Sequence, residues 1–364
     1  MVASAAIDRI ETNVYRVPTD LPEADGTAEW AETTIVVATV AAGSTEGLGY
    51  SYCEAGAADV IEHMLAPLVR GRRPEELPAI RAVLEHKVRN TGRDGLVACA
   101  LSAMDVALWD LRARLLDVPL LALLGRASPS ARAYGSGGFT TYDDSTMAQQ
   151  LRGWVAAGMT AAKIKIGESR GGAESRDLHR VRLAREAIGP SVELFVDANG
   201  GYTPSQARRM ERALQEFGVR WFEEPVSSDM PEELADIRSS SRMDIAAGEY
   251  CWRVQDAARL LEARAVDCLQ LDVTRCGGFT GWLQGAAVAA AHGVEISAHC
   301  APQLSAHAVC ASPNARHLEY FHDHARIEPL LFDGTLHVRS GALVPHDLPG
   351  HGLSVSDRAE EFRT

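Results

Sequence analysis

Short apolar segments that each end in an ionisable side chain recur through the second half of the chain. They alternate with amphipathic stretches of helix length, such as DLHRVRLAREAIG and TPSQARRMERALQEFG. After Lys165 the ionisable residues follow one another at intervals of 20 to 32 residues, the length of one strand plus one helix. They are Lys163 and Lys165, Asp197, Glu223, Glu249, Asp272, His299 and Glu319. This repetition predicts a parallel sheet, and about eight repeats predict a closed β/α barrel rather than an open sheet.

The first third of the chain lacks these repeats and predicts a separate domain. Residues 1 to about 55 alternate in the manner of strands around a polar stretch, PTDLPEADGTAEWAE, which favours a meander with an irregular loop. Residues 57–125 place apolar side chains at helical intervals, so this part reads as an α+β domain. We place this domain at residues 1–127, the barrel at 128–330, and at 331–364 a C-terminal segment that packs back on the first domain.

Charge and composition restrict the partners that the chain can bind. The formal net charge is −13, and nucleic acids and anionic membranes are recognised mainly through excess lysine and arginine, so neither is expected as a partner. The N-terminus has no signal-peptide pattern and the seven scattered cysteines include no CxxC pair, which indicates a cytoplasmic protein with reduced thiols. No G-x-G-x-x-G motif follows a strand, so a nucleotide site has no support.

Three carboxylates end successive strands and should converge on one point. Asp197, Glu223 and Glu249 occupy this position, and in a β/α barrel the carboxyl ends of the strands form the mouth of the active site. Carboxylates a few ångströms apart repel one another unless a cation lies between them, and an all-oxygen set suits Mg²⁺. With Mg²⁺ and the two lysines the local charge becomes slightly positive, so we expect a small-molecule carboxylate as substrate.

Two further groups are placed to move protons. Lys163 and Lys165 are two positions apart, so their side chains face the same way, and the charge of Lys163 should lower the pKa of Lys165 toward that of a base. Asp272 and His299 end adjacent strands, where a carboxylate can fix the imidazole tautomer and raise its basicity. The hypothesis is that Lys165 removes the proton α to a substrate carboxylate and that Mg²⁺ stabilises the resulting enediolate.

The ordered set of strand-end motifs resembles the enolase superfamily and, within it, the mandelate racemase subgroup. The motifs are KIK, DANGGY, FEEP, AGE, DVTRCGG, SAH and LEY on the second to eighth strands. The resemblance covers the barrel and the N-terminal domain, and it implies an α/β fold, a modified TIM barrel of the (β/α)7β type with an N-terminal α+β capping domain. A lysine on the sixth strand, as in the muconate lactonizing and dipeptide epimerase types, is absent because LQLDVTRC carries Asp272 there.

The resemblance also implies a role for each site residue. The implied Mg²⁺ ligands are Asp197, Glu223 and Glu249, and the implied acid/base catalysts are Lys165, with Lys163 beside it, and His299 with Asp272 on the opposite face of the substrate. Glu319 would hydrogen-bond a substrate carboxylate oxygen, Asn199 would help to orient the substrate, and Glu224 would support the metal ligand that precedes it. We also expect a homo-oligomer.

The same first step can lead to two reactions. If His299 returns a proton to the same carbon, the enzyme is a racemase or epimerase of a 2-hydroxy acid. If His299 protonates a departing β-hydroxyl, the enzyme is a dehydratase that converts an aldonate or aldarate to a 2-keto-3-deoxy acid. A barrel that only binds metal or carboxylate is a third possibility, and we disfavour it because every catalytic role is filled.

Two stretches of the capping domain are expected to close over the substrate. TDLPEADGTAEW, residues 19–30, carries four acids, which favours a hydroxylated substrate and hence the dehydratase, although the acids could instead face solvent. In GLGYSYCE, residues 47–54, Tyr50 and Tyr52 could contact the substrate through their hydroxyls or could pack.

Overall fold

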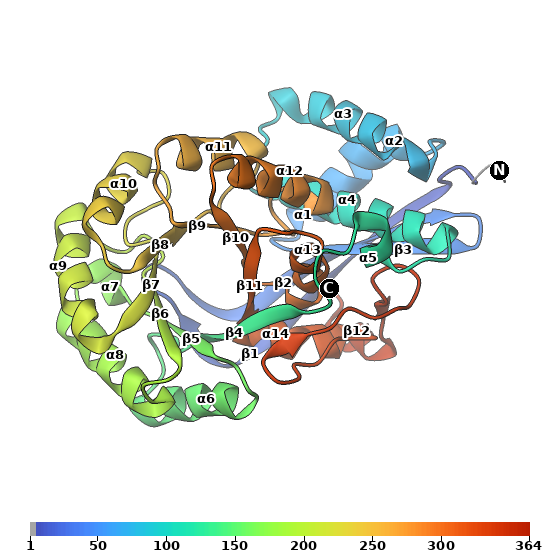
Figure 1. Ribbon diagram of the computed structural model, residues 1–364. Helices are drawn as coiled ribbons and strands as arrows, with labels where there is room; N and C mark the ends of the chain where they lie inside the picture. The colour runs from blue at the N-terminus through green and yellow to red at the C-terminus, as the bar shows by residue number, and fades with distance from the viewer. Residues whose placement is uncertain (1–4) are drawn as a thin grey trace.

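Eight parallel strands close on themselves into a barrel. The computed structural model describes residues 5–364. The barrel strands are β4 (Ala131–Gly137), β5 (Ala161–Lys165), β6 (Glu193–Asp197), β7 (Val219–Glu223), β8 (Asp244–Ala247), β9 (Cys268–Leu271), β10 (Glu295–Ala298) and β11 (Ala315–Phe321). Each strand pairs with the next, and β11 pairs with β4, where Leu318 lies opposite Ala133. The prediction of a closed α/β barrel is confirmed (Figure 1).

Helices cover the outside of the barrel, one in each connection between successive strands (Figure 1). They are α6 (Asp144–Ala156), α8 (Glu174–Ile188), α9 (Pro204–Leu214), α10 (Pro231–Ser240), α11 (Val254–Glu262), α12 (Gly278–Ala291) and α13 (Pro302–Cys310). A short turn, α7 (Glu168–Gly171), precedes α8, and α14 (His322–Leu331) follows the last strand. The architecture is therefore (β/α)7β. No helix in residues 5–364 is long and apolar enough to cross a membrane.

Local sequence fixes where the barrel helices begin and end, and α9 is an example. The Thr203 side chain accepts a hydrogen bond from the backbone N of Gln206, and the Gln206 side chain accepts one from the backbone N of Thr203. This capping box, with Pro204 at the first helical position, starts the helix. Gly218, in the left-handed conformation, ends the turn that follows α9. The next strand, β7, can therefore begin directly at Val219.

Three antiparallel strands form the sheet of the N-terminal cap. They are β1 (Arg9–Ala24), β2 (Glu29–Ala42) and β3 (Thr45–Tyr52). The meander is confirmed, but the expected irregular loop is wrong, because β1 and β2 continue pairing beyond the end of β3 and shift register only between Pro18 and Glu23. The Asp25 carboxylate accepts hydrogen bonds from the backbone N of Thr27 and of Ala28, which closes a tight turn. The polar stretch is thus a hairpin.

Helices complete the cap, and the longest of them packs tightly on its sheet. They are α1 (Gly56–Asp59), α2 (Ala66–Val69), α3 (Leu77–Lys87), α4 (Leu96–Leu115) and α5 (Leu120–Leu124), with a π-helical turn at Val60–Leu65 between α1 and α2. The predicted helical segments are confirmed. Gly47 and Gly49 of β3 touch the backbone of α4 so closely that an added Cβ would collide with the carbonyls of Ala107 and Ala103. Most of the stretch 47–54 is therefore a strand packed on α4.

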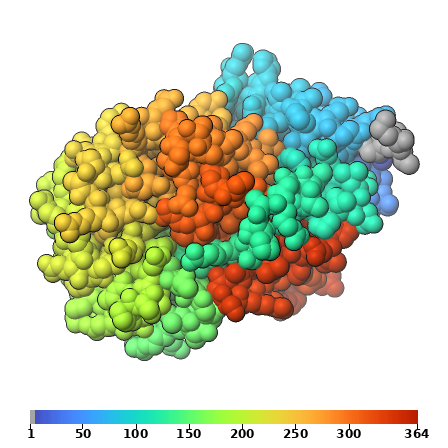
Figure 2. Space-filling view, viewed as in Figure 1, coloured from blue at the N-terminus to red at the C-terminus, as the bar shows by residue number. Residues whose placement is uncertain are grey.

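The residues after α14 contact both the cap and the barrel. The short strands here are β12 (Phe332–Asp333), β13 (Ala342–Leu343) and β14 (Ser354–Val355). β13 pairs with β4 of the barrel, whereas Arg363 forms a bridge with Tyr15 of β1 in the cap. The backbone N of Leu120 in α5 donates a hydrogen bond to the carbonyl of Gly350. Figure 2 shows the C-terminal segment, in red, against a teal segment. The C-terminal segment thus contacts both the cap and the barrel, and the division into domains at residues 127 and 330 stays a prediction.

Glu328 of α14 is buried where cap and barrel meet and gives the fold a pH dependence. It accepts hydrogen bonds from Tyr50 Oη at 2.7 Å and from the backbone N of Gln303 at 3.4 Å. Burial raises the pKa of Glu328 from 4.5 to about 8. The folded state therefore keeps a proton that the unfolded chain releases above pH 4.5. This contribution to stability is full at low pH and is lost as the pH rises toward 8.

The variant Glu328→Gln, which mimics the protonated acid, is expected to remove this dependence. Relative to the variant, the wild type should lose up to about 3 kcal/mol of unfolding free energy between pH 5 and pH 8. Urea unfolding at the two pH values measures the difference, with exposed Glu262→Gln as the matched control. Equal pH dependence of the wild type and Glu328→Gln would contradict the assignment.

Candidate active site

The ionisable strand-end residues meet at the carboxyl ends of the barrel strands. Lys163 and Lys165 lie on β5 and Glu319 on β11, Asp197 and Glu223 end β6 and β7, and Glu249, Asp272 and His299 follow β8, β9 and β10. Each of the eight is at most 5% exposed. Because side chains alternate along a strand, Ile164 points the other way, into the core cluster that packs on the helices. The structure therefore brings together all eight residues that the repeats single out.

An aromatic layer fills the barrel beneath these residues. Phe195 stacks on Trp221 with ring centroids 5.4 Å apart, and Tyr134 lies edge-on to Phe195 at 5.3 Å. Trp221 Nε1 donates a hydrogen bond to Glu223 Oε2 at 2.9 Å, so this layer also orients a carboxylate of the site. A ligand can therefore approach only from the side of the strand ends.

Three carboxylates form a cluster suited to a divalent cation. Asp197, Glu223 and Glu249 each offer an oxygen within 4.8 Å of those of the other two. Glu249 Oε2 is buried and has no hydrogen-bond partner among the described residues, which is unfavourable unless a ligand binds it. Burial, together with the charge of Asp197, raises the pKa of Glu223 well above its usual range. A cation between the three groups relieves both costs, and this all-oxygen set fits Mg²⁺.

The two lysines of β5 neutralise part of this negative charge. Lys163 Nζ lies 2.7 Å from both Glu223 oxygens and 2.8 Å from Glu319 Oε1, and Lys165 Nζ lies 2.5 Å from Asp197 Oδ2. Burial and the charge of Lys163 both lower the pKa of Lys165, but the carboxylates of Asp197, Glu319 and Glu249 together raise it above its usual value. The expected net lowering is therefore wrong, because Asp197 is in direct contact. A cation bound to Asp197 would offset the carboxylate charge, so Asp197 would raise the pKa of Lys165 by less.

His299 is held by a carboxylate through one ring nitrogen and presents the other to the site. Nδ1 lies 2.7 Å from Asp272 Oδ2, so the predicted hydrogen bond is present. Burial raises the pKa of Asp272, but His299, Arg275 and Thr274 together lower it below its usual value. Nε2 lies 3.5 Å from Glu249 Oε2 and 3.8 Å from Glu319 Oε2. The second nitrogen is thus aimed at the carboxylate cluster.

Arg275 belongs to the site although our sequence analysis gave it no role. Its Nε lies 3.6 Å from Asp272 Oδ2 and its Nη1 3.5 Å from Glu249 Oε1, while the guanidinium covers the ring of Tyr250 at 5.4 Å. It follows Asp272 by three residues in DVTRC, and this closeness to a strand-end acid was a usable signal. Arg275 therefore links the histidine partner to one of the three clustered carboxylates.

The remaining predicted residues differ in their access to the site. Asn199 donates its backbone N to Asp197 Oδ1 at 2.8 Å, and its buried side-chain oxygen has no hydrogen-bond partner among the described residues. Glu224 is buried, and burial raises its pKa well above the usual range. Tyr50 uses its hydroxyl to bind Glu328, and Tyr52 stacks on His324 with centroids 3.3 Å apart. Both tyrosines pack between β3 and α14, and their contact with substrate stays a prediction.

The hairpin of residues 19–30 lies on the barrel mouth. The backbone N of Thr140 donates to the carbonyl of Ala24 at 2.9 Å, and that of Arg170 donates to Gly26 at 3.0 Å. Trp30 packs edge-on against Phe139 at 5.6 Å. Loops that follow the first two barrel strands therefore hold the hairpin in place.

The four acids of the hairpin have different surroundings. Asp25 closes the turn, Asp20 lies 3.1 Å from His322 Nε2, and Glu29 is exposed. Glu23 is only 1% exposed and accepts a hydrogen bond from Trp30 Nε1, but its Oε1 has no hydrogen-bond partner among the described residues. Burial raises the pKa of Glu23 to about 8. The four acids therefore do not all face solvent. Glu23 is the buried one, and it lies beside the mouth.

Gly26 lets the tip of the hairpin touch the barrel. A Cβ at this position would lie 2.7 Å from the carbonyl of Ala198 and 2.8 Å from that of Ile166. Gly26→Ala is therefore expected to lift the hairpin and to lower kcat/KM by about 10- to 100-fold, because closing loops position the substrate. Steady-state kinetics measures the effect, and Gly153→Ala in α6, where an added Cβ meets nothing within 4 Å, is the matched control. Unchanged kinetics in Gly26→Ala would show that closure does not depend on this contact.

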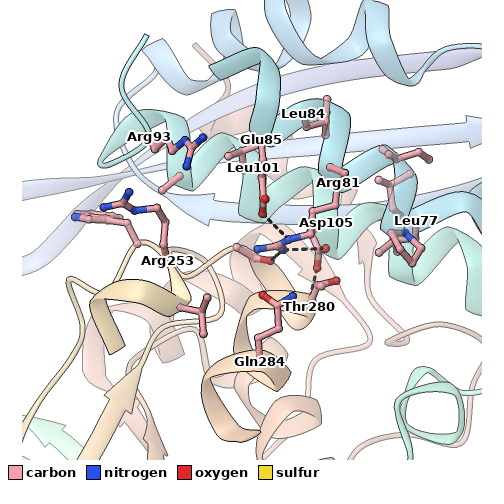
Figure 3. A pocket seen from close by; sticks show the side chains of 18 of the residues that line it. Leu77, Arg81, Leu84, Glu85, Arg93, Leu101, Asp105, Arg253, Thr280 and Gln284 are labelled. Atoms are coloured by element: carbon pink, nitrogen blue, oxygen red, sulfur yellow. Dashed lines mark hydrogen bonds and ion pairs between the residues drawn. The ribbon is translucent and has the colours of Figure 1, made fainter. Parts of the chain in front are cut away.

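Two cavities lie outside the cluster of strand-end residues. One of about 690 Å³ lies between α3 and α4 of the cap and α11 and α12 of the barrel, where Arg81 and Asp105 form an ion pair (Figure 3). The other, of about 580 Å³, lies at the hairpin tip between residues 24–29 and the loops that follow β4 and β5. None of the eight strand-end residues lines either cavity, but the second adjoins the mouth.

Comparison with known proteins identifies the family. Residues 9–125 match the model of the mandelate racemase/muconate lactonizing enzyme N-terminal domain, and residues 146–359 match the enolase C-terminal domain-like model. L-talarate/galactarate dehydratase of Salmonella typhimurium is 31% identical over 87% of this chain and 79% of its own. D-galactarolactone cycloisomerase of Agrobacterium fabrum is 34% identical over 80% of this chain and 81% of its own.

Solved structures share the whole fold. A mandelate racemase/muconate lactonizing enzyme-like protein from Rubrobacter xylanophilus has 46% identity and a TM-score of 0.95, covering 99% of this chain and 100% of its own. The Salmonella dehydratase liganded with Mg and L-lyxarohydroxamate has 26% identity and a TM-score of 0.91, covering 100% of this chain and 94% of its own. The relatives are lyases and isomerases, and Mg²⁺ is the cofactor that the carboxylate cluster fits. The chain is an enzyme of the mandelate racemase/muconate lactonizing enzyme family, within the enolase superfamily.

Proposed function

We propose that the protein is a Mg²⁺-dependent dehydratase that converts an acid sugar, an aldonate or aldarate, to a 2-keto-3-deoxy acid. The observation that carries the proposal is the placement of two proton-transfer groups on different sides of the barrel. Lys165 lies on β5 and His299 follows β10, with β4 and β11 between them one way around and four strands the other way. A substrate bound between them would have one group on each face.

In this proposal Asp197, Glu223 and Glu249 hold Mg²⁺, which when bound supplies positive charge that favours an enediolate over a carboxylate. Lys165 Nζ takes the proton α to the substrate carboxylate. Lys163 and Glu319, which already contact each other at 2.8 Å, position the carboxylate oxygens, and Asn199 orients the substrate with its unpartnered side-chain oxygen.

His299 completes the elimination as a general acid. Its Nε2 donates a proton to the β-hydroxyl, which leaves as water while the electrons of the former α C–H bond form the double bond of an enol. Tautomerisation of the enol gives the 2-keto product. Asp272, at 2.7 Å from Nδ1, stabilises the protonated imidazole before this transfer.

A hydroxylated substrate is supported by the relatives and by the hairpin. The relative from Salmonella acts on talarate and galactarate, as its name states. Glu23 of the hairpin has a buried carboxyl oxygen without a hydrogen-bond partner, and its raised pKa keeps it largely protonated at neutral pH, so it can donate to or accept from a substrate hydroxyl.

A panel of aldonic and aldaric acids tests the proposal. The enzyme with Mg²⁺ is incubated with each acid in D₂O, and 2-keto product, α-deuteration and optical rotation are followed, with chelator-treated enzyme as the control. Keto product that requires Mg²⁺ supports dehydration. Deuteration with a change of rotation and no keto product identifies a racemase or epimerase instead. Neither change with any acid would overturn both assignments.

A further inference from the structure

One side chain beside the catalytic histidine has no task in the proposed reaction. Cys300 follows the histidine directly, is 3% exposed, and places Sγ 3.2 Å from His299 Nε2 and 3.5 Å from Glu319 Oε2. His299 Nε2 and Glu319 Oε2 are 3.8 Å apart. A nitrogen, a sulfur and an oxygen ligand atom therefore form a small buried triangle beside the carboxylate cluster.

The triangle has the dimensions of one face of a zinc coordination tetrahedron. Zn–S bonds of about 2.3 Å and Zn–N and Zn–O bonds of about 2.0–2.2 Å place tetrahedral ligands roughly 3.4–3.6 Å apart. The three distances between the ligand atoms, 3.2, 3.5 and 3.8 Å, lie within a few tenths of an ångström of these edges. Little movement would bring all three atoms onto one ion.

Each ligand atom is also held by an outer partner. Asp272 Oδ2 lies 2.7 Å from His299 Nδ1 and so fixes the orientation of the ring. Histidines that bind a metal are commonly held by a carboxylate through their other ring nitrogen in this way. Glu319 accepts hydrogen bonds from Ser136 Oγ on Oε1 at 2.5 Å and from the backbone N of Cys300 on Oε2 at 3.1 Å. The ligand set is therefore oriented before any ion arrives.

We propose that His299 Nε2, Cys300 Sγ and Glu319 Oε2 form an inhibitory site for a soft divalent cation, with Zn²⁺ as the best fit, distinct from the Mg²⁺ carboxylates. Thiolate and imidazole favour Zn²⁺, whereas Mg²⁺ prefers oxygen ligands only, so excess Mg²⁺ should not compete. Binding releases the thiol proton to solvent and occupies the histidine nitrogen that would move a proton. Binding does not depend on the proposed function, and only the inhibition rests on it.

Cobalt spectroscopy tests the binding without any substrate. Co²⁺ is added to the enzyme saturated with Mg²⁺, because a cobalt–thiolate bond gives a charge-transfer band in the near ultraviolet. The band is expected in the wild type, lost in Cys300→Ser, and displaced by Zn²⁺. Cys99→Ser is the matched control, because Cys99 lies beside Cys53 and this thiol pair is the competing source of a band. A thermal melt of each variant with Mg²⁺ confirms that it is folded.

The outcomes separate the site from its alternatives. A band that survives in Cys300→Ser, or no band in the wild type, would overturn the site. A band lost only in Cys99→Ser would assign the metal to the other thiols and would overturn it too. Loss of a residue that only orients a metal ligand typically weakens metal binding by roughly 10- to 100-fold. Loss of the ligand Cys300 itself should weaken Zn²⁺ binding by at least this factor.

Inhibition is measured on formation of the 2-keto product, the step assigned to His299, with each variant compared with its own rate in Mg²⁺ alone. Zinc should inhibit the wild type and Cys99→Ser at the same concentrations. Inhibition of Cys300→Ser should require a zinc concentration that is higher by the factor by which the loss of the ligand weakens Zn²⁺ binding. Equal zinc sensitivity of all three would place inhibition at the Mg²⁺ carboxylates and contradict the proposal. If no acid is turned over, the cobalt result still decides whether the site exists.

Discussion

Replacing Lys165 by alanine should lower α-proton exchange from the accepted acid sugar by about 10²- to 10⁴-fold, the usual contribution of a positioned general base. Its amine lies beside the carboxylate cluster, 2.5 Å from Asp197 Oδ2. The loss should appear as a lower kcat with little change in Mg²⁺ affinity, because the three clustered carboxylates are intact. Exchange is followed by the appearance of deuterium at the α-carbon in D₂O.

Two further variants make this result specific. Lys165→Arg keeps a positive charge beside Asp197 but cannot act as a base near neutral pH, so it should be as inactive as Lys165→Ala. Exposed Lys87→Ala controls for the loss of a lysine elsewhere. Undiminished exchange in Lys165→Ala, with the protein folded, would rule out Lys165 as the base.

Replacing His299 by asparagine should separate the two halves of the reaction. Formation of keto product should fall by about 10²- to 10⁴-fold, because the group that protonates the departing hydroxyl is lost. Exchange of an α-proton that faces Lys165 should continue within a few-fold of the wild-type rate. Product formation and deuterium incorporation are measured in the same sample, with exposed His292→Asn as the control.

The relation between the two rates decides the role of His299. If His299→Asn still forms keto product at the wild-type rate, another acid protonates the leaving group. If both rates fall together, His299 instead takes part in forming the enediolate or in binding the substrate. Only loss of product with retained exchange supports the assignment of elimination to the histidine.

Much of the barrel and of its ionisable cluster could be predicted from the sequence because both follow from periodicity. A repeat of one strand and one helix fixes the strand order, and alternation along β5 places Lys163 and Lys165 inside and Ile164 outside. Since parallel strands end at one edge, residues at their carboxyl ends must meet. These arguments need only spacing and residue type.

The remaining features depend on contacts between distant segments, which spacing does not encode. The pKa of Lys165 depends on the 2.5 Å contact with Asp197, which outweighs its neighbour on the same strand. The polar hairpin extends as two strands because loops of the barrel bind its backbone, and the Tyr50 hydroxyl binds Glu328, which is far along the chain. Cys300 had no sequence signal beyond its position after His299.

The closure of β11 on β4 also determines when this enzyme can first become active. Its ionisable site spans residues 163 to 319, and the barrel cannot close until Phe321, at the end of the last strand, has been synthesised. Arg363 forms a bridge with Tyr15 of the cap, a contact between residues still further apart in the sequence. Contacts this distant in sequence form slowly, so a nascent chain exposes unpaired barrel strands until β11 has been made. Dependence on chaperones is therefore expected to be greatest before β11 pairs with β4.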